Sequence, residues 1–93
     1  MNISFDPAKR QVALEERGVD FADALEVFEG PELTASDDRR DYGEDRFVTY
    51  GYLKGRAVIL VWTPRDDGRR IISMRHANDR ERSRYEAALG RSG

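Results

Sequence analysis

The sequence predicts an α+β domain in which an antiparallel sheet of three to four strands carries two N-terminal helices packed on one face and is followed by a C-terminal helix. Apolar residues recur at helical spacing before residue 30. Between residues 46 and 76, strand-length blocks of apolar and aromatic residues are separated by short turns. A capping signal near residue 78 then begins the last helix. With the helices grouped on one face, the other face of the sheet is expected to be open, which an antiparallel sheet tolerates.

Two helices are predicted in the first thirty residues. Met1–Phe5 alternates weakly and is a candidate for a short strand before them. Asp6-Pro7 suits the N-cap and first turn of a helix that Gly18 ends. The second helix begins after Asp20 and ends at Gly30-Pro31. Its apolar face, with helical spacing, consists of Phe21, Ala24, Leu25 and Phe28. Both helices are expected to serve core packing.

The strands of the sheet are predicted from the middle of the chain. Leu33–Ala35 is a candidate for a short strand, and Arg46–Leu53 has aromatic residues on both faces. Lys54-Gly55 makes a tight turn into Arg56–Thr63, whose continuous apolar run is typical of a central strand. Arg69–His76 follows a second, turn-rich loop. On this last strand, Ile71, Ser73 and Arg75 are expected on one face and Ile72, Met74 and His76 on the other.

Composition limits the classes of protein to which the chain can belong. Its 93 residues suffice for one domain with a thin core, and its charged fraction of 37% is combined with periodic apolar blocks, which argues against disorder. The absence of cysteine and the single histidine exclude disulfides, a thiolate nucleophile and a sulfur-based or histidine-rich metal site. Neither a signal peptide nor an apolar run of membrane-spanning length is recognised, so a soluble cytoplasmic protein without a cofactor is expected.

Charge is distributed unevenly along the chain. Residues 1–45 hold five Lys or Arg and thirteen Asp or Glu, a net charge of −8, whereas residues 46–93 hold eleven and five, a net charge of +6. This asymmetry indicates either an anionic partner for the second half or two halves that neutralise each other at the surface. The acidic stretch Ser36–Asp45 has no recognisable ligand spacing for a metal and is interpreted as a solvated loop.

Candidate RNA-binding residues are expected on the open face of the sheet. Ser73 and Arg75 lie on the predicted last strand, and Arg46 lies near them if the strand register allows it. The aromatic residues on neighbouring strands are Tyr50, Tyr52 and Trp62. Guanidinium groups that hold phosphates, beside rings that stack on bases, suit single-stranded RNA. The alternative is ordinary cross-strand packing, which is the stronger interpretation for Trp62 on the most buried strand.

His76 is the candidate for proton transfer. Its unperturbed pKa suits a general acid or base near neutral pH, and it ends a strand beside Arg75. A structural role is the more frequent one for a lone histidine. RNA can be cleaved without a metal when the 2′-hydroxyl attacks the adjacent phosphate, provided that cations stabilise the added charge and a side chain moves protons.

The last helix adds further positive charge. Asn78 and Glu81 have the spacing of a capping box at its start. Arg80 and Arg84, with Arg91, form a basic stripe along it, while Tyr85, Ala88 and Leu89 form another stripe.

Several blocks in order along the chain carry a family resemblance. They are Phe5-Asp6-Pro7-Ala8-Lys9; Gly18-Val19 with Phe21, Ala24 and Val27-Phe28; Asp45-Arg46-Phe47 before Gly51; Val61-Trp62-Thr63; Arg70-Ile71-Ile72-Ser73 with Arg75 and Ala77; Arg80-Glu81-Arg82; and Tyr85-Glu86. With these blocks the chain resembles the BrnT family of ribonuclease toxins from type II toxin–antitoxin pairs, which are related in fold to RelE-like toxins. The resemblance covers nearly the full length and implies one toxin domain over residues 1–93.

The resemblance implies a toxin that cleaves RNA and inhibits translation. It also implies a BrnA-type antitoxin that occludes the active face, forms a hetero-oligomer with the toxin and supplies the only contacts to operator DNA. By position, Arg46, Arg75 and Arg80 become the catalytic, phosphate-binding candidates. With the residues chosen above, the RNA-binding set is Arg46, Tyr50, Ser73, Arg75, Arg80 and Arg84. The role of His76 is inferred from its chemistry, because the family commonly has a basic residue at that place.

The first helix departs from the family pattern. The family commonly reads Asn-x-x-Lys-His-Gly at its end, whereas Ala13, Glu16 and Arg17 precede Gly18 in this chain. If the replaced groups take part in catalysis, the chain is a weak or altered nuclease; if they only cap the helix, little changes, since Arg17 still favours a helix C-terminus. Two alternatives to a nuclease follow: a catalytically weak or inactive module that holds its antitoxin and assists promoter repression, and a generic RNA-binding domain.

Overall fold

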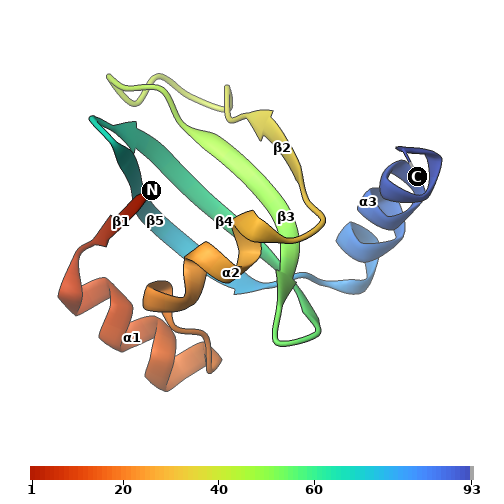
Figure 1. Cartoon of the computed structure of the whole chain (residues 1–93), viewed down its shortest axis with the longest axis horizontal. Coiled ribbons are helices and arrows are strands. Elements are labelled where there is room, and N and C mark those ends of the chain that lie inside the picture. The colour runs from red at the N-terminus through yellow and green to blue at the C-terminus, as the bar shows by residue number, and fades with distance from the viewer. Residues whose placement is uncertain (93) are drawn as a thin grey trace.

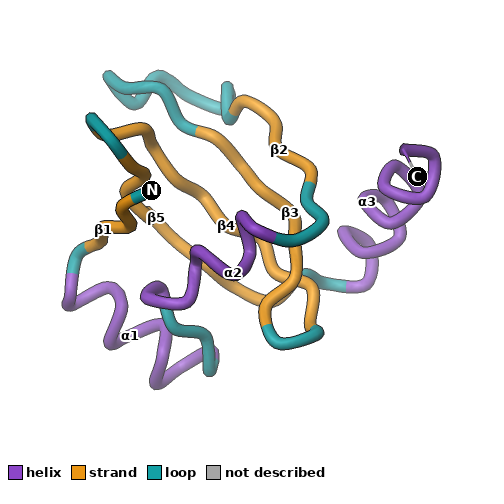
Figure 2. The backbone as a smooth tube through the Cα atoms, in the orientation of Figure 1, coloured by secondary structure: helices purple, strands orange, loops and turns teal. Residues whose placement is uncertain are grey.

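The computed structural model describes residues 1–92, with side chains as far as Gly90, so the side chain of Arg91 in the predicted basic stripe lies outside the described part. The elements are β1 (Asn2–Phe5), α1 (Pro7–Arg17), the 3-10 turn η1 (Phe21–Asp23), α2 (Ala24–Glu29), β2 (Leu33–Ser36), β3 (Phe47–Leu53), β4 (Arg56–Arg65), β5 (Gly68–His76) and α3 (Asp79–Ser92). Figures 1 and 2 show α1 and α2 together at one side of a single sheet and α3 well apart from them. None of the described helices is long and apolar enough to cross a bilayer.

The α+β class is confirmed, but the sheet has five strands in the order β1-β5-β4-β3-β2. The prediction of three to four strands, all antiparallel, is wrong because the weakly patterned β1 pairs with β5 in parallel, from Asn2 opposite Gly68 to Phe5 opposite Ile71. Gly68 permits this close approach, since a Cβ at that position would lie 2.0 Å from the carbonyl oxygen of Asn2. A pairing between strands this far apart in sequence leaves little trace in the local pattern.

The N-terminal helical segments pack on one face of the sheet. The Asp6 carboxylate accepts a hydrogen bond from the N–H of Ala8 at 2.9 Å, and Gly18 ends α1 with a φ of 69°, as the sequence predicts. After Asp20, the second helix begins as η1 rather than as an α-helix. The buried core on this side consists of Ala13, Val19, Phe21, Ala24, Val27, Leu53, Val58, Leu60, Trp62, Ile71 and Met74.

A β-bulge in β5 decides which of its side chains share a face. Val61 and Trp62, neighbours on β4, pair with Ser73 and Ile71, so Ile72 is an extra residue in β5. The sequence predicted that Ile71 and Ser73 share a face, but Ile71 is buried in the helix-side core, whereas Ser73 is not part of it. The prediction is wrong because strict alternation of side chains stops at the bulge.

The opposite face of the sheet, expected to be open, is partly covered by α3. Tyr85 stacks on Tyr50, with ring centroids 4.9 Å apart, and Leu89 packs against the same small cluster. The hydroxyls of Tyr50 and Tyr52 both donate to the Glu86 carboxylate, that of Tyr50 at 3.1 Å. Tyr50 is fully buried by these contacts. Its predicted role in stacking on an RNA base is therefore wrong, because α3 already occupies its ring face.

Replacement of Gly51 by alanine is expected to lower the free energy of unfolding by about 1–3 kcal/mol. The reason is that a Cβ at Gly51, on β3, would lie 2.7 Å from Cγ1 of Val27, on α2. Gly90→Ala on α3 is the matched control: nothing lies within 4 Å of its Cβ position, so the same added methyl group is expected to cause no loss. Urea unfolding measures both variants, and unchanged stability of Gly51→Ala would contradict this close packing of α2 on β3.

Candidate functional site

A groove crosses the uncovered part of the sheet between α3 and the loop that follows β2. Its volume is about 550 Å³. We call it the sheet groove; it is lined by Ala35, Ser36, Asp37, Asp38, Arg39, Val48, Ile59, Val61, Ser73, Arg75, Glu81, Arg84 and Tyr85. The central strands β3 and β4 contribute only apolar side chains, whereas the charged side chains come from the loop, from β5 and from α3.

Three arginines reach the sheet groove from three separate parts of the chain. Arg39 comes from the loop after β2, Arg75 from β5 and Arg84 from α3. The pKa of Arg75 is raised, chiefly by its hydrogen bonds to Glu81, while the charge of Arg39 acts against this rise. Arg39 and Arg75 therefore place two like charges in one groove, and an anionic ligand bound there would relieve their repulsion.

The Glu81 carboxylate holds the guanidinium of Arg75. Nη1 and Nη2 of Arg75 each donate to a different Glu81 oxygen at 2.8 Å. The same carboxylate accepts from the backbone N–H of Asn78 at 3.0 Å, and the Asn78 side chain accepts from the N–H of Glu81 at 2.8 Å. The predicted capping box is therefore confirmed, and it ties the ion pair to the first turn of α3. Hydrogen bonding to Arg75 lowers the pKa of Glu81 to about 2.

One edge of the Arg75 guanidinium remains available to a ligand. Glu81 takes the two hydrogens at the end of the group, and a longer contact of 3.4 Å joins Nη1 to the carbonyl of His76. Among the described residues no acceptor binds Nε–H, which forms the second donor pair of the fork with Nη2. The side chain is 45% exposed. A phosphate can bind this edge in a bidentate manner while the Glu81 pair stays intact.

Asp37 holds Arg39 in a similar way. Only 1% of the Asp37 side chain is exposed, and its carboxylate accepts from Nε and Nη2 of Arg39 at 2.7 and 2.9 Å. These hydrogen bonds lower the pKa of Asp37. Two of the three groove carboxylates, Asp37 and Glu81, are thus bound to arginines. Within the described chain, no group of three or more His, Asp or Glu side chains is placed to hold a metal ion.

Tyr85 lies near two of the groove arginines. Its ring is held by stacking on the buried ring of Tyr50, and the guanidinium carbon of Arg84 lies 5.5 Å from its centroid. Tyr85 also lines the sheet groove together with Arg75. A phenol that is fixed in place beside cations can give a proton to a leaving oxygen.

Only part of the predicted residue set meets in the sheet groove. Ser73, Arg75 and Arg84 line it, whereas Arg80 is exposed on α3 and does not. Arg46 also lies outside the groove lining, because its guanidinium stacks 4.0 Å from the ring centroid of Tyr42 and pairs with Glu44 at 3.3 Å.

His76 does not share a site with Arg75, although the two are neighbours in β5. His76 lines two other pockets, which are formed by the β3–β4 hairpin with the end of α1 or with α3. Burial and the charge of Arg56 lower its pKa. The expectation that His76 and Arg75 act side by side is wrong in its geometry, because successive side chains of a strand point to opposite faces.

The aromatic residues of the central strands also lie outside the groove. Trp62 is on the helix side of the sheet, where it stacks on Phe47 with centroids 4.9 Å apart and donates from Nε1 to Thr49 at 2.9 Å. Ordinary core packing, the alternative interpretation, is thereby confirmed for Trp62. Tyr52 is engaged by Glu86 of α3.

Four groove residues are not identified as site residues from the sequence. Asp37 and Arg39, with Asp38 between them, fall in Ser36–Asp45, which the sequence analysis interprets as a solvated loop, and Tyr85 is assigned there only to a helix stripe. An acid two residues before an arginine, at the end of a strand, was the available signal for the first pair. Nothing local distinguishes Arg39 from its neighbour Arg40, because the distinction arises from the pairing of β2 with β3.

Comparison with protein families agrees with the resemblance noted in the sequence. The family described as "Ribonuclease toxin, BrnT, of type II toxin-antitoxin system" matches residues 5–81. A comparison with individual curated proteins gave no match. The matched stretch contains β2 to β5 and the groove residues Arg39, Arg75 and Glu81, while Arg84 and Tyr85 follow it.

The contribution of Glu81 to stability is expected to depend on pH. Its folded-state pKa of about 2 lies below the ordinary value of 4.5. The ion pair therefore stabilises the fold fully above that ordinary value, and the contribution is lost as the pH falls toward the folded pKa. Glu81→Gln is expected to lower the free energy of unfolding at neutral pH. In this variant the free energy of unfolding is also expected to fall less steeply as the pH is lowered. Urea unfolding at about pH 6 and about pH 3 measures this, with exposed Glu29→Gln as the control. An unaltered pH slope in Glu81→Gln would contradict it.

Proposed function

The chain belongs to the BrnT family of ribonuclease toxins of type II toxin–antitoxin systems, and we propose that it cleaves RNA in the sheet groove without a metal. The observation that carries the proposal is the convergence of Arg39, Arg75 and Arg84 on one groove. Cleavage of a phosphodiester adds negative charge to the phosphate in the transition state, and cations that are already in position stabilise that charge. Arg75 meets this requirement best, because Glu81 orients it and one of its donor edges is free.

In the proposed reaction, the 2′-oxygen of a ribose attacks the adjacent phosphorus and the bond from phosphorus to the 5′-oxygen breaks. Asp38 takes the proton of the 2′-hydroxyl, and Tyr85 gives a proton to the leaving 5′-oxygen. The products are a cyclic 2′,3′-phosphate and a 5′-hydroxyl, and solvent restores both side chains. Asp38 is assigned as the base because Asp37 and Glu81 each hold an arginine, whereas Asp38 accepts from the hydroxyl of Ser36 at 2.9 Å.

This assignment replaces three roles expected from the sequence. Proton transfer is assigned to Asp38 and Tyr85 in place of His76, since His76 lies outside the sheet groove. Arg80 and Arg46 take no chemical step, for the same reason. Arg80 lies one turn before Arg84 on α3, and we assign it to contacts with the RNA backbone beyond the groove. Ser73, on the floor of the groove between β4 and the edge of the sheet, contacts RNA but does not react.

Family membership implies an antitoxin protein as partner. We propose that it is a BrnA-type antitoxin encoded beside the toxin, that it forms a hetero-oligomer with this chain and closes the sheet groove to RNA, and that it alone contacts operator DNA. Release of the toxin then leads to cleavage of RNA and inhibition of translation in the cytoplasm.

A second candidate function is a weak or inactive module that only holds its antitoxin. The observation that favours it is that Asp37 and Glu81 neutralise two of the three groove arginines. The departures of α1 from the family pattern favour it less: Ala13 is buried in the core, and Arg17 donates to the carbonyl of Met74 at 3.3 Å, away from the groove lining. Purified chain incubated with RNA in EDTA separates the two functions. Cleavage supports the nuclease, and intact RNA with tight antitoxin binding supports the module.

Arg75→Ala is expected to reduce RNA cleavage by about 10²–10³-fold and to abolish growth inhibition, because a positioned cation is removed from the reacting phosphate. Arg39→Ala tests the loop in the same way, with Arg40→Ala as its matched control, since only Arg39 lines the groove. Cleavage of a fluorescent RNA oligonucleotide is measured in EDTA, and circular dichroism checks the fold. Full toxicity of Arg75→Ala at equal expression would remove Arg75 from the mechanism.

Tyr85→Phe is expected to reduce cleavage by about 10²-fold or more while the melting temperature stays the same, because the phenyl ring keeps its stacking on Tyr50. His76→Asn is expected to retain most of the activity, since His76 lies in other pockets. Single-turnover cleavage rates of the two variants decide between the two residues. The reverse ranking would return proton transfer to His76.

A further inference from the structure

The C-terminal half of β5 is a free edge of the sheet. β1 pairs with β5 only from Gly68 to Ile71, so the segment from Ile72 to His76 has β4 on one side and no strand on the other within the described chain. Free strand edges of this kind are templates for pairing with another extended chain.

The backbone groups on this edge point outward in alternation. The N–H of Ala77 donates to the carbonyl of Ala57 at 2.9 Å. The backbone N–H and C=O groups of Ala77 therefore point toward β4, and so do those of Arg75 and Ser73, two and four residues earlier. The backbone N–H and C=O groups of Met74 point to the free side, and the hydrogen bond of 3.3 Å from Arg17 to the Met74 carbonyl agrees with this direction. Because that hydrogen bond is long and comes from a flexible side chain, an incoming strand can replace it.

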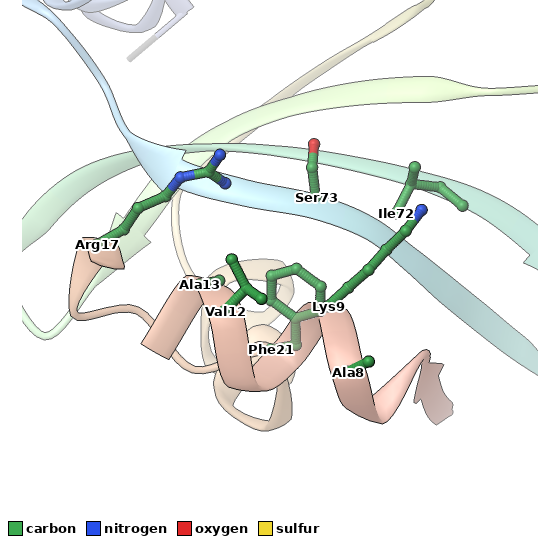
Figure 3. Close-up of a pocket in the computed structure, with 8 residues that line it drawn as sticks. All are labelled: Ala8, Lys9, Val12, Ala13, Arg17, Phe21, Ile72 and Ser73. Carbon is green, nitrogen blue, oxygen red and sulfur yellow. The ribbon is translucent and has the colours of Figure 1, made fainter. Parts of the chain in front are cut away.

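An apolar cleft runs along the same edge. It lies between α1 and β5, has a volume of about 460 Å³, and is lined mainly by apolar side chains, among them Ala8, Val12 and Ile72. Figure 3 shows Val12 pointing from α1 toward β5, with Lys9 at one end of the cleft and Arg17 at the other. Val12 is 49% exposed, so its side chain is accessible to a ligand that enters the cleft.

The charges around the cleft select the kind of partner. The charged side chains that line the cleft, Lys9 and Arg17, are both cations. A second copy of this chain, paired edge to edge about Met74, would bring two Arg17 side chains together, which charge repulsion opposes. An acidic segment would instead be attracted to both ends of the cleft.

We propose that the free edge of β5 and the cleft beside α1 bind an extended acidic segment of a protein partner as an added strand. Alternate side chains of that segment pack on Val12 and Ile72, its carboxylates pair with Lys9 and Arg17, and its backbone bonds to the outward groups of β5. RNA is the less favoured occupant, because an apolar lining and outward backbone donors and acceptors match a peptide strand.

The test uses the full chain and a phage-displayed library of random twelve-residue peptides. The expected result is enrichment of sequences in which acidic and apolar residues alternate, since alternation is the pattern of a strand. Binding of the selected peptides, measured by fluorescence anisotropy, is expected to weaken by about tenfold or more in Val12→Glu and Arg17→Glu, which repel acidic side chains. Leu25→Glu is the matched control, because Leu25 is also an exposed apolar helix residue but lies outside the cleft.

Three outcomes would overturn the proposal: no enrichment, peptides without acidic residues, or equal loss of binding in Leu25→Glu and Val12→Glu. A single-stranded RNA oligonucleotide is tested as the alternative ligand. If Val12→Glu weakens its binding more than Leu25→Glu does, the cleft is assigned to RNA instead. RNA cleavage is assayed in parallel on the unmodified chain. If peptides bind but RNA is not cleaved, the docking edge is supported and the nuclease activity is rejected. If RNA is cleaved but no peptide binds, the nuclease activity is supported and the docking edge is rejected.

Discussion

The position of α3 on the sheet depends on the carboxylate of Glu81. It accepts both end donors of Arg75 from β5 and the N–H of Asn78 at the start of α3. One carboxylate thus accepts from a backbone N–H at the start of the helix, which has no partner within the helix, and also neutralises an arginine of the strand. Beyond it, α3 is held mainly by Tyr85, Glu86 and Leu89. Without Glu81, only these later contacts would fix the distance between α3 and Arg75.

The bulge at Ile72 is the second constraint on the site. It allows Ile71 to enter the helix-side core while Ser73 and Arg75 face the groove, although all three belong to one strand. Without the extra residue, regular alternation would place Ile71 on the groove face or send Arg75 into the core. The apolar part of β5 therefore anchors the helices and its polar part serves the groove, and neither function disturbs the other.

The local features of the chain could be predicted from sequence, because their causes lie within a few residues. The Asp6 cap, the turn at Gly18 and the pair Asn78 and Glu81 are of this kind, and so was the place of Arg75 on an open face. What could not be predicted depends on contacts between distant segments. The parallel pairing of β1, the bulge, and the burial of Asp37 follow from the register of strands that are far apart in sequence. The same holds for Tyr85, which enters the site only because Tyr50 lies beneath it.

Ser73 connects the two surfaces of β5, because it lines both the sheet groove and the cleft beside α1. A strand added at the free edge would extend the sheet directly next to Ser73. The added chain would then border the side of the groove that is now open. Long RNA would then lose its path across the edge, while Arg75 and its pairing with Glu81 would remain as they are. A partner bound at the edge could in this way restrict access to the arginines without touching them, so occlusion of the groove and formation of a stable complex need not require the same contacts.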